Sequence, residues 1–181
     1  MRIRLALAGA ALSLLVVQAA GAVVMVGGEA MYPSKTIVEN AVNSADHTTL
    51  VAAVKAAGLV EVLAGPGPFT VFAPVNSAFA ALPAGTVDTL LKPENKDTLV
   101  AVLTYHVVPG DYDASALMQL IEANGGWAKL TTVQGETLTA KMNGPMNVVI
   151  EDAKGHVANI VTYDVDQSNG VIHVIDTVLM P

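Results

Sequence analysis

The stretch FTVFAPVNSAF, from Phe69 to Phe79, decides the fold because it joins two kinds of secondary structure without a long connection. Its first five residues are aromatic, β-branched or small, which is typical of a short buried strand. Pro74 ends this run, and Asn76 is a good N-cap for a short helix that follows. The stretch therefore predicts a core strand that leads directly into a helix.

The residues before this stretch, 34–64, carry a helical pattern. Thr36 and Glu39 have the spacing of a capping box, which marks the start of a helix. Asp46 resembles the N-cap of a second helix, and Gly58 resembles its C-terminal cap. The run Gly65-Pro66-Gly67-Pro68 then prevents any further helix.

The residues after this stretch predict helices first and strands last. The expected helices cover 84–103 and 114–123, a β-like segment covers 104–108, and the expected strands cover 127–133, 136–142, 146–152, 156–165 and 171–179. Asn169-Gly170, between the last two strands, is a strong hairpin signal. This order indicates a single α+β domain with an antiparallel sheet.

The first 22 residues have the pattern of a secretory signal peptide. Two arginines precede an apolar run from Leu5 to Val17, and Ala20-Gly21-Ala22 is a small-residue cleavage site. An uncleaved anchor is the alternative, because Leu5–Val26 is long enough to span a bilayer. We therefore divide the chain into a signal peptide (1–22), a linker (23–33) and a domain (34–181). In either case we expect the domain to be exported, in the periplasm or at the cell surface.

The charge of the chain excludes several classes of partner. The formal net charge is -7, and removing residues 1–22 leaves seven lysines, no arginine and 16 acidic residues, which gives -9. Such a domain repels nucleic acid and lacks the guanidinium groups that grip phosphates and guanines. We therefore expect no nucleic-acid partner, and membrane contact only if the N-terminal segment stays uncleaved. The absence of cysteine excludes a disulfide scaffold. We also expect the protein to be a monomer.

Three segments in order carry a family resemblance. They are FTVFAPVNSAF (69–79), Tyr105-His106, and NGVIHVID (169–176). Together they resemble the fasciclin-type domain, also called the beta-Ig-h3 domain, over residues 34–181. The resemblance implies a compact β-wedge of about seven mostly antiparallel strands with a helical layer. It also implies an adhesion module of the secreted or surface-anchored kind.

The residues carry no recognised catalytic or metal-binding motif. We expect His47 and His156 to be exposed, while His173 and Asp176 face opposite sides of a strand and cannot share a metal ion. There is no Gly-x-Ser-x-Gly motif, and the prolines at 66 and 68 remove amide donors that a phosphate loop needs. We therefore expect a protein that is not an enzyme, with no catalytic residue, cofactor or metal.

Four residues are the candidates for partner binding. In a strand Tyr105 and His106 would face opposite ways, so one could enter the core while the other meets a partner. The resemblance links this pair to receptor or integrin engagement, and the alternative is a buried histidine bonded to backbone. Asp164-Val165 is similar to the Asp-Ile adhesion motif of the family, with strand packing as the alternative. Trp127 is expected to be a core anchor rather than a ligand platform.

Two functions follow from these observations. The first is an exported adhesion module that binds a cell-surface or matrix protein or carbohydrate without catalysis. The alternative is a periplasmic protein that binds a small ligand or has a structural role. Exposure of Tyr105 and His106 would favour the first over a pure scaffold. A deep apolar pocket with converging polar groups would favour the second.

Overall fold

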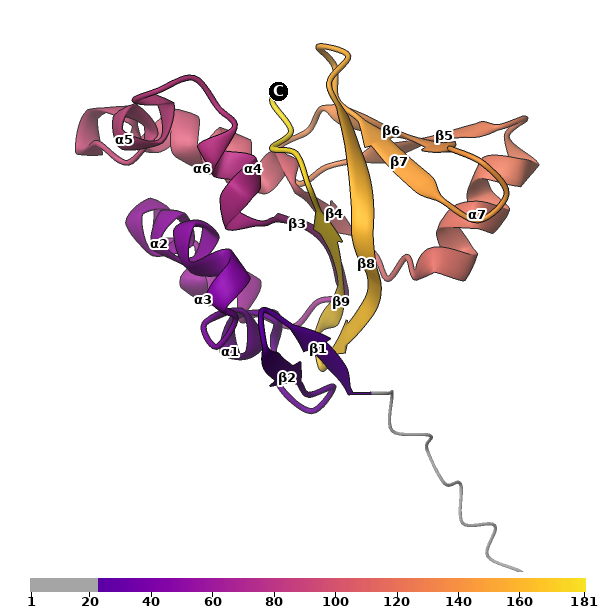
Figure 1. Cartoon of the computed structure of the whole chain (residues 1–181), viewed down its shortest axis with the longest axis horizontal. Coiled ribbons are helices and arrows are strands. Elements are labelled where there is room, and N and C mark those ends of the chain that lie inside the picture. The colour runs from indigo at the N-terminus through magenta and orange to yellow at the C-terminus, as the bar shows by residue number, and fades with distance from the viewer. Residues whose placement is uncertain (1–22) are drawn as a thin grey trace, which may run out of the picture.

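The computed structural model describes residues 23–181, and Figure 1 shows their arrangement. The predicted signal peptide, 1–22, lies outside the described residues. Within the described part of the chain, no helix is both long and apolar enough to cross a membrane.

The centre of the fold is a seven-stranded sheet with the order β4-β3-β9-β8-β7-β6-β5. Its strands are β3 (Phe69–Pro74), β4 (Val107–Pro109), β5 (Trp127–Thr131), β6 (Thr137–Met142), β7 (Val148–Glu151), β8 (Val157–Gln167) and β9 (Gly170–Ile175). Only β3 and β9 pair in parallel within this sheet, and the other neighbours are antiparallel. The predicted α+β class and the mostly antiparallel sheet are therefore confirmed.

Helices cover both sides of this sheet (Figure 1). They are α1 (Ile37–Ala41), α2 (Thr48–Ala57), α3 (Val60–Leu63), α4 (Asn76–Ala80), α5 (Thr86–Leu90), α6 (Lys96–Tyr105) and α7 (Ala114–Ala123), with short 3₁₀ helices at Ala45–His47 and Pro93–Asn95. Helices α1 to α6 gather beside β3 and β9, whereas α7 lies against β5, β6 and β7. The sheet thus lies between a large helical layer and a single helix.

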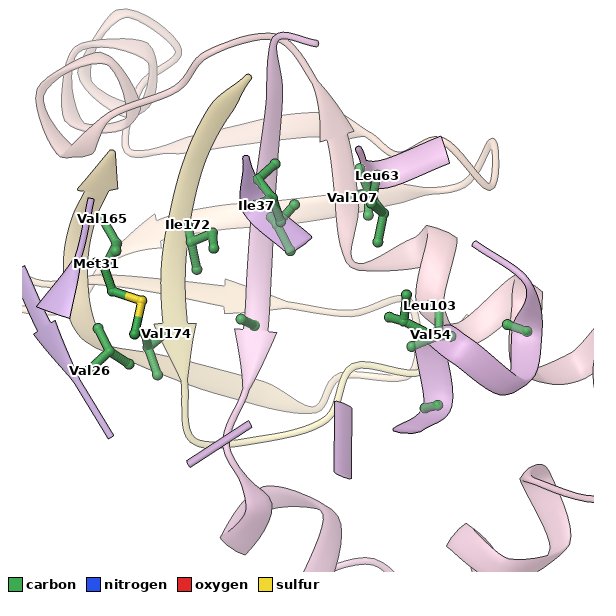
Figure 2. Packing of buried hydrophobic residues seen from close by; sticks show 14 of the residues in the cluster. Val26, Met31, Ile37, Val54, Leu63, Leu103, Val107, Val165, Ile172 and Val174 are labelled. Carbon is green, nitrogen blue, oxygen red and sulfur yellow. The ribbon is translucent and has the colours of Figure 1, made fainter. Parts of the chain in front are cut away.

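Strand alternation divides the core into two main clusters. On β9, Ile172 and Val174 face the layer formed by α1 to α3 and α6, and Figure 2 shows this cluster. His173 and Ile175 face the opposite way, where Ile175 packs in the α7 cluster and His173 stacks on Phe72. The predicted alternation of the last strand is confirmed for Ile172 to Ile175, but β9 ends at Ile175 rather than at residue 179, so Asp176 lies outside the strand. A third, smaller cluster holds Phe79 of α4.

The segment 23–33 is not a linker, contrary to the sequence prediction. It forms a hairpin of β1 (Val24–Val26) and β2 (Glu29–Met31), whose two-residue turn is Gly27-Gly28. Both glycines have positive φ values, 60° and 81°, which is the backbone that a tight hairpin turn requires. Val26 and Met31 are buried in the core, and burial of these side chains fixes the hairpin to the helical layer.

The predicted helix caps are confirmed in part. The capping box of Thr36 and Glu39 is present, and Gly58 ends α2 in the left-handed conformation. Asp46 is not the N-cap of α2, because it lies in the preceding 3₁₀ helix. Asn76 does not cap its own helix α4 and instead caps α2 from a distance. Its Oδ1 accepts a hydrogen bond from the Thr49 amide at 3.0 Å, and its amide nitrogen donates to the carbonyl of Ala45 at 2.8 Å.

Candidate functional site

The three segments that carry the family resemblance meet at one place in the fold. Strands β3 and β9, from the first and third segments, pair in parallel from Phe69 with Gly170 to Pro74 with Ile175. The pairing is so close that a Cβ at Gly170 would collide with the Phe69 carbonyl oxygen. The second segment joins them, since the Phe72 amide donates a 2.9 Å hydrogen bond to the His106 carbonyl.

Tyr105 is the last residue of α6, and its side chain is fully buried. Its hydroxyl donates to the carbonyl of Thr137 at 3.2 Å and accepts from the amide of Ala153 at 3.0 Å. Burial raises the pKa of this hydroxyl, so the group stays protonated and can keep both bonds. Tyr105 therefore ties α6 to β6 and to the turn between β7 and β8.

His106 follows Tyr105 as the C-cap of α6 and is also buried. The Leu179 amide can only donate, so His106 Nε2 accepts from it at 3.0 Å, and Nδ1 donates to the Val102 carbonyl at 2.8 Å. Both bonds need the neutral imidazole, because a proton on Nε2 would face the Leu179 N–H. Burial lowers the pKa of His106 to about 4. His106 thus holds the C-terminal segment against α6.

The predicted geometry of Tyr105 and His106 is therefore wrong. The pair closes a helix rather than forming a strand, so both side chains turn inward instead of facing opposite ways. The missed signal was the apolar period of α6, which continues through Leu99 and Leu103 to this pair. Side chains this deeply buried cannot contact a partner, and the alternative prediction of an internal role matches their bonds.

Asp164 and Val165 lie at an irregularity of β8, where the pairing with β9 shifts register. Asp164 has a φ of 52°, and its Oδ1 accepts a 2.7 Å hydrogen bond from the amide of Ala114 at the start of α7. Val165 is buried in the cluster on the other side of the sheet. Asp164 therefore positions α7, while Val165 packs as the alternative prediction stated and offers no exposed surface.

The histidines are spread over separate environments. His173 is buried, donates from Nε2 to the Tyr112 carbonyl at 2.8 Å, and has its pKa lowered by burial. His47 was predicted to be exposed but is buried, because it is the N-cap residue of α2 at the edge of the core, where its Nδ1 bonds the Ser44 hydroxyl at 2.9 Å. His156 is exposed, as predicted, and pairs with Asp152 at 2.8 Å. Among residues 23–181, no three histidine or acidic side chains form a group that could hold a metal ion.

An exposed surface lies on the opposite face of the sheet from α7. We call it the outer face, and its solvent-accessible residues on β5 to β8 include Trp127, Lys129, Thr139, Lys141, Glu151, Val157 and Asn159. On β5 these residues alternate with the buried Ala128 and Leu130. The outer face is therefore a solvated sheet surface built on a packed inner face.

Trp127 is the most prominent residue of the outer face, and its predicted role as a core anchor is wrong. The side chain is 47% exposed and stands opposite Lys141 in the next strand. Lys129 Nζ lies 5.9 Å from the centre of the Trp127 ring, and Lys141 forms an ion pair with Glu151. The signal that could have found this surface was the alternation Trp127-Ala128-Lys129, which places the ring on the same side as a lysine.

The fold and the internal junction of the three segments define a domain of the fasciclin type. The family model described as Fasciclin domain matches residues 45–181, and the chain belongs to this family. Protein sll1483 of Synechocystis sp. is 53% identical over 148 residues, which cover 81% of this chain and 73% of that protein. Cell surface glycolipoprotein MPB83 of Mycobacterium bovis is 37% identical over 123 residues, which cover 68% of this chain and 48% of that protein.

A solved structure supports the same fold. It is a pair of FAS1 domains from the insect cell adhesion molecule Fasciclin I, with a TM-score of 0.73 and 19% sequence identity. The similarity covers 83% of this chain and 52% of the insect chain, which corresponds to about one domain of that pair.

Proposed function

We propose that this protein is an exported surface-interaction module that binds a cell-surface or matrix protein or carbohydrate without catalysis. Family membership supports adhesion, since a structural neighbour is a cell adhesion molecule and one relative is a cell-surface glycolipoprotein. The signal-peptide pattern of residues 1–22 supports export. Tyr105 and His106 have scaffold roles in this proposal.

The observation that carries the proposal is the exposed indole of Trp127 on a rigid sheet. Tryptophan is enriched among the residues that dominate binding energy at interfaces, because it buries a large area with little loss of side-chain entropy. The neighbouring Lys129 and Lys141 add charged donors to an otherwise acidic domain. The outer face therefore combines an aromatic anchor with a polar rim, which is the composition of an interaction surface.

The experiment measures how many cells a coated surface of the purified protein retains. We expect Trp127→Ala to lose most of the retention while its thermal unfolding midpoint stays close to that of the wild type, because the ring is not part of the core. Val62→Ala is the control, since Val62 is 51% exposed and belongs to α3 of the helical layer rather than to the outer face.

Two results would contradict the proposal. A wild-type coat that retains no cell type would remove the adhesion function. If a Trp127→Ala coat retains as many cells as the wild type, the protein is still an adhesion module, but the outer face is not its binding surface.

A further inference from the structure

A cavity lies between the helical layer and the central strands. Its walls come from α1, α2, α3 and α6, from the hairpin β1–β2, and from β3 and β9. Figure 2 shows several of the side chains that line it, among them Met31, Val54 and Val174. The space open to the centre of a water molecule is about 60 Å³, so the cavity is larger than the site of a single water.

The lining of the cavity is almost wholly hydrocarbon. Its polar side chains are Ser44, His47, Lys55 and His106. Ser44 Oγ and His47 Nδ1 bond to each other, and both ring nitrogens of His106 are occupied by backbone groups. His47 Nε2 is the one buried side-chain atom of the described lining without a hydrogen-bond partner. Water inside would find few partners, so such a space stays dry and gains energy when an apolar group fills it.

Two residues of the cavity lining reach the surface, one just after α1 and one on α2. Val42, just after α1, is 47% exposed, and Lys55 on α2 is also exposed. Burial lowers the pKa of both His47 and His106, so these imidazoles are neutral at neutral pH. Among the described residues that line the cavity, Lys55 is therefore the single charged group.

We propose that this cavity binds a single-chain amphiphile with a carboxylate head, such as a fatty acid. The hydrocarbon chain lies between the helical layer and β9, and the carboxylate meets Lys55 Nζ where the lining reaches the surface. An apolar cavity with one cation among its lining residues is complementary to this class of molecule in polarity and charge. The site is separate from the outer face and does not depend on adhesion.

The experiment titrates the purified protein with cis-parinaric acid, whose fluorescence rises in apolar surroundings. We expect saturable binding with one site per chain and displacement by dodecanoate. Lys55→Gln should weaken displacement by dodecanoate about two- to fivefold, as for an exposed ion pair. The same variant should leave displacement by dodecanol unchanged, because dodecanol has no charge.

A second pair of variants tests the place of binding. Ala41→Phe puts a ring into the lining and should weaken probe binding tenfold or more, whereas Ala52→Phe on the exposed side of α2 should bind like the wild type. Lys55→Gln keeps the proposal testable if Ala41→Phe does not fold, since Lys55 is a surface residue. Absence of saturable binding, or full binding by a folded Ala41→Phe, would overturn the proposal. Equal effects of Lys55→Gln on dodecanoate and dodecanol would overturn the role of the carboxylate.

Discussion

At the scale of single residues, the domain depends on polar side chains that are buried and fully bonded. His106, Tyr105 and Asn169 each join segments that are far apart in the sequence. Asn169 accepts from the Ile37 amide at 3.0 Å and donates to the carbonyls of Leu63 and Gly65. A buried polar group of this kind costs energy when a partner is lost, so these residues specify the fold rather than a binding surface.

Because three histidines are buried in neutral form, the stability of the domain should depend on pH. The unfolded chain takes up a proton on each histidine near pH 6.5, whereas folded His106 does so only near pH 4. Stability is therefore complete above pH 6.5 and falls as the pH drops toward 4, with His106 alone contributing on the order of 3 kcal/mol. His47 and His173 act in the same direction, since burial lowers their pKa as well.

Urea unfolding at pH 7.5 and pH 4.5 measures this effect. The midpoint should be clearly lower at pH 4.5, and His106→Gln should show a smaller difference between the two pH values. Asp166 opposes the trend, because burial, followed by the charges of Asp164 and other nearby aspartates, raises its pKa. A midpoint that stays constant or rises at pH 4.5 would contradict the account of the buried histidines.

At the scale of elements, periodicity predicted most helices and strands, including α7 at its observed bounds. It failed where a residue acts on a distant element. Asn76 was expected to cap the helix it begins, but its side chain satisfies the start of α2, 27 residues earlier. No local sequence pattern indicates this hydrogen bond, because α2 and Asn76 are separated in the chain by β3 and lie together only in the folded domain. The hairpin β1–β2, in contrast, had a local signal in Gly27-Gly28.

The cap formed by Asn76 predicts a specific loss of stability. Asn76→Ala removes the acceptor for the Thr49 amide and the donor to Ala45, and should lower the free energy of unfolding by about 1–2 kcal/mol. Asn76→Asp keeps the acceptor oxygen and should lower the free energy of unfolding by a smaller amount. Asn95→Ala is the control, because the Asn95 side chain bonds only the nearby Thr89 carbonyl on the surface. Chemical denaturation of the three variants checks the order, and an Asn76→Ala variant as stable as the Asn95 control would contradict it.

At the scale of the whole molecule, the sequence predicted the fold class because three short segments lie at the junction of β3, β9 and α6. It did not predict the outer face, although the alternation Trp127-Ala128-Lys129 places the ring on the same side as a lysine, because a single tryptophan was expected in the core. For a related reason, Tyr105 and His106 were wrongly expected to include a residue that meets a partner. Motif residues such as Tyr105 and His106 reflect what the fold requires, and the fold requires them inside.

We propose that the Tyr105–His106 pair maintains the scaffold and that recognition takes place elsewhere. His106→Ala leaves the Leu179 amide and the Val102 carbonyl without partners, and should cost about 2–4 kcal/mol of stability. The most direct test measures cell retention and the thermal unfolding midpoint on the same His106→Ala sample. Both should fall together, with retention per folded molecule equal to that of the wild type. Retention lost at an unchanged midpoint would contradict this proposal.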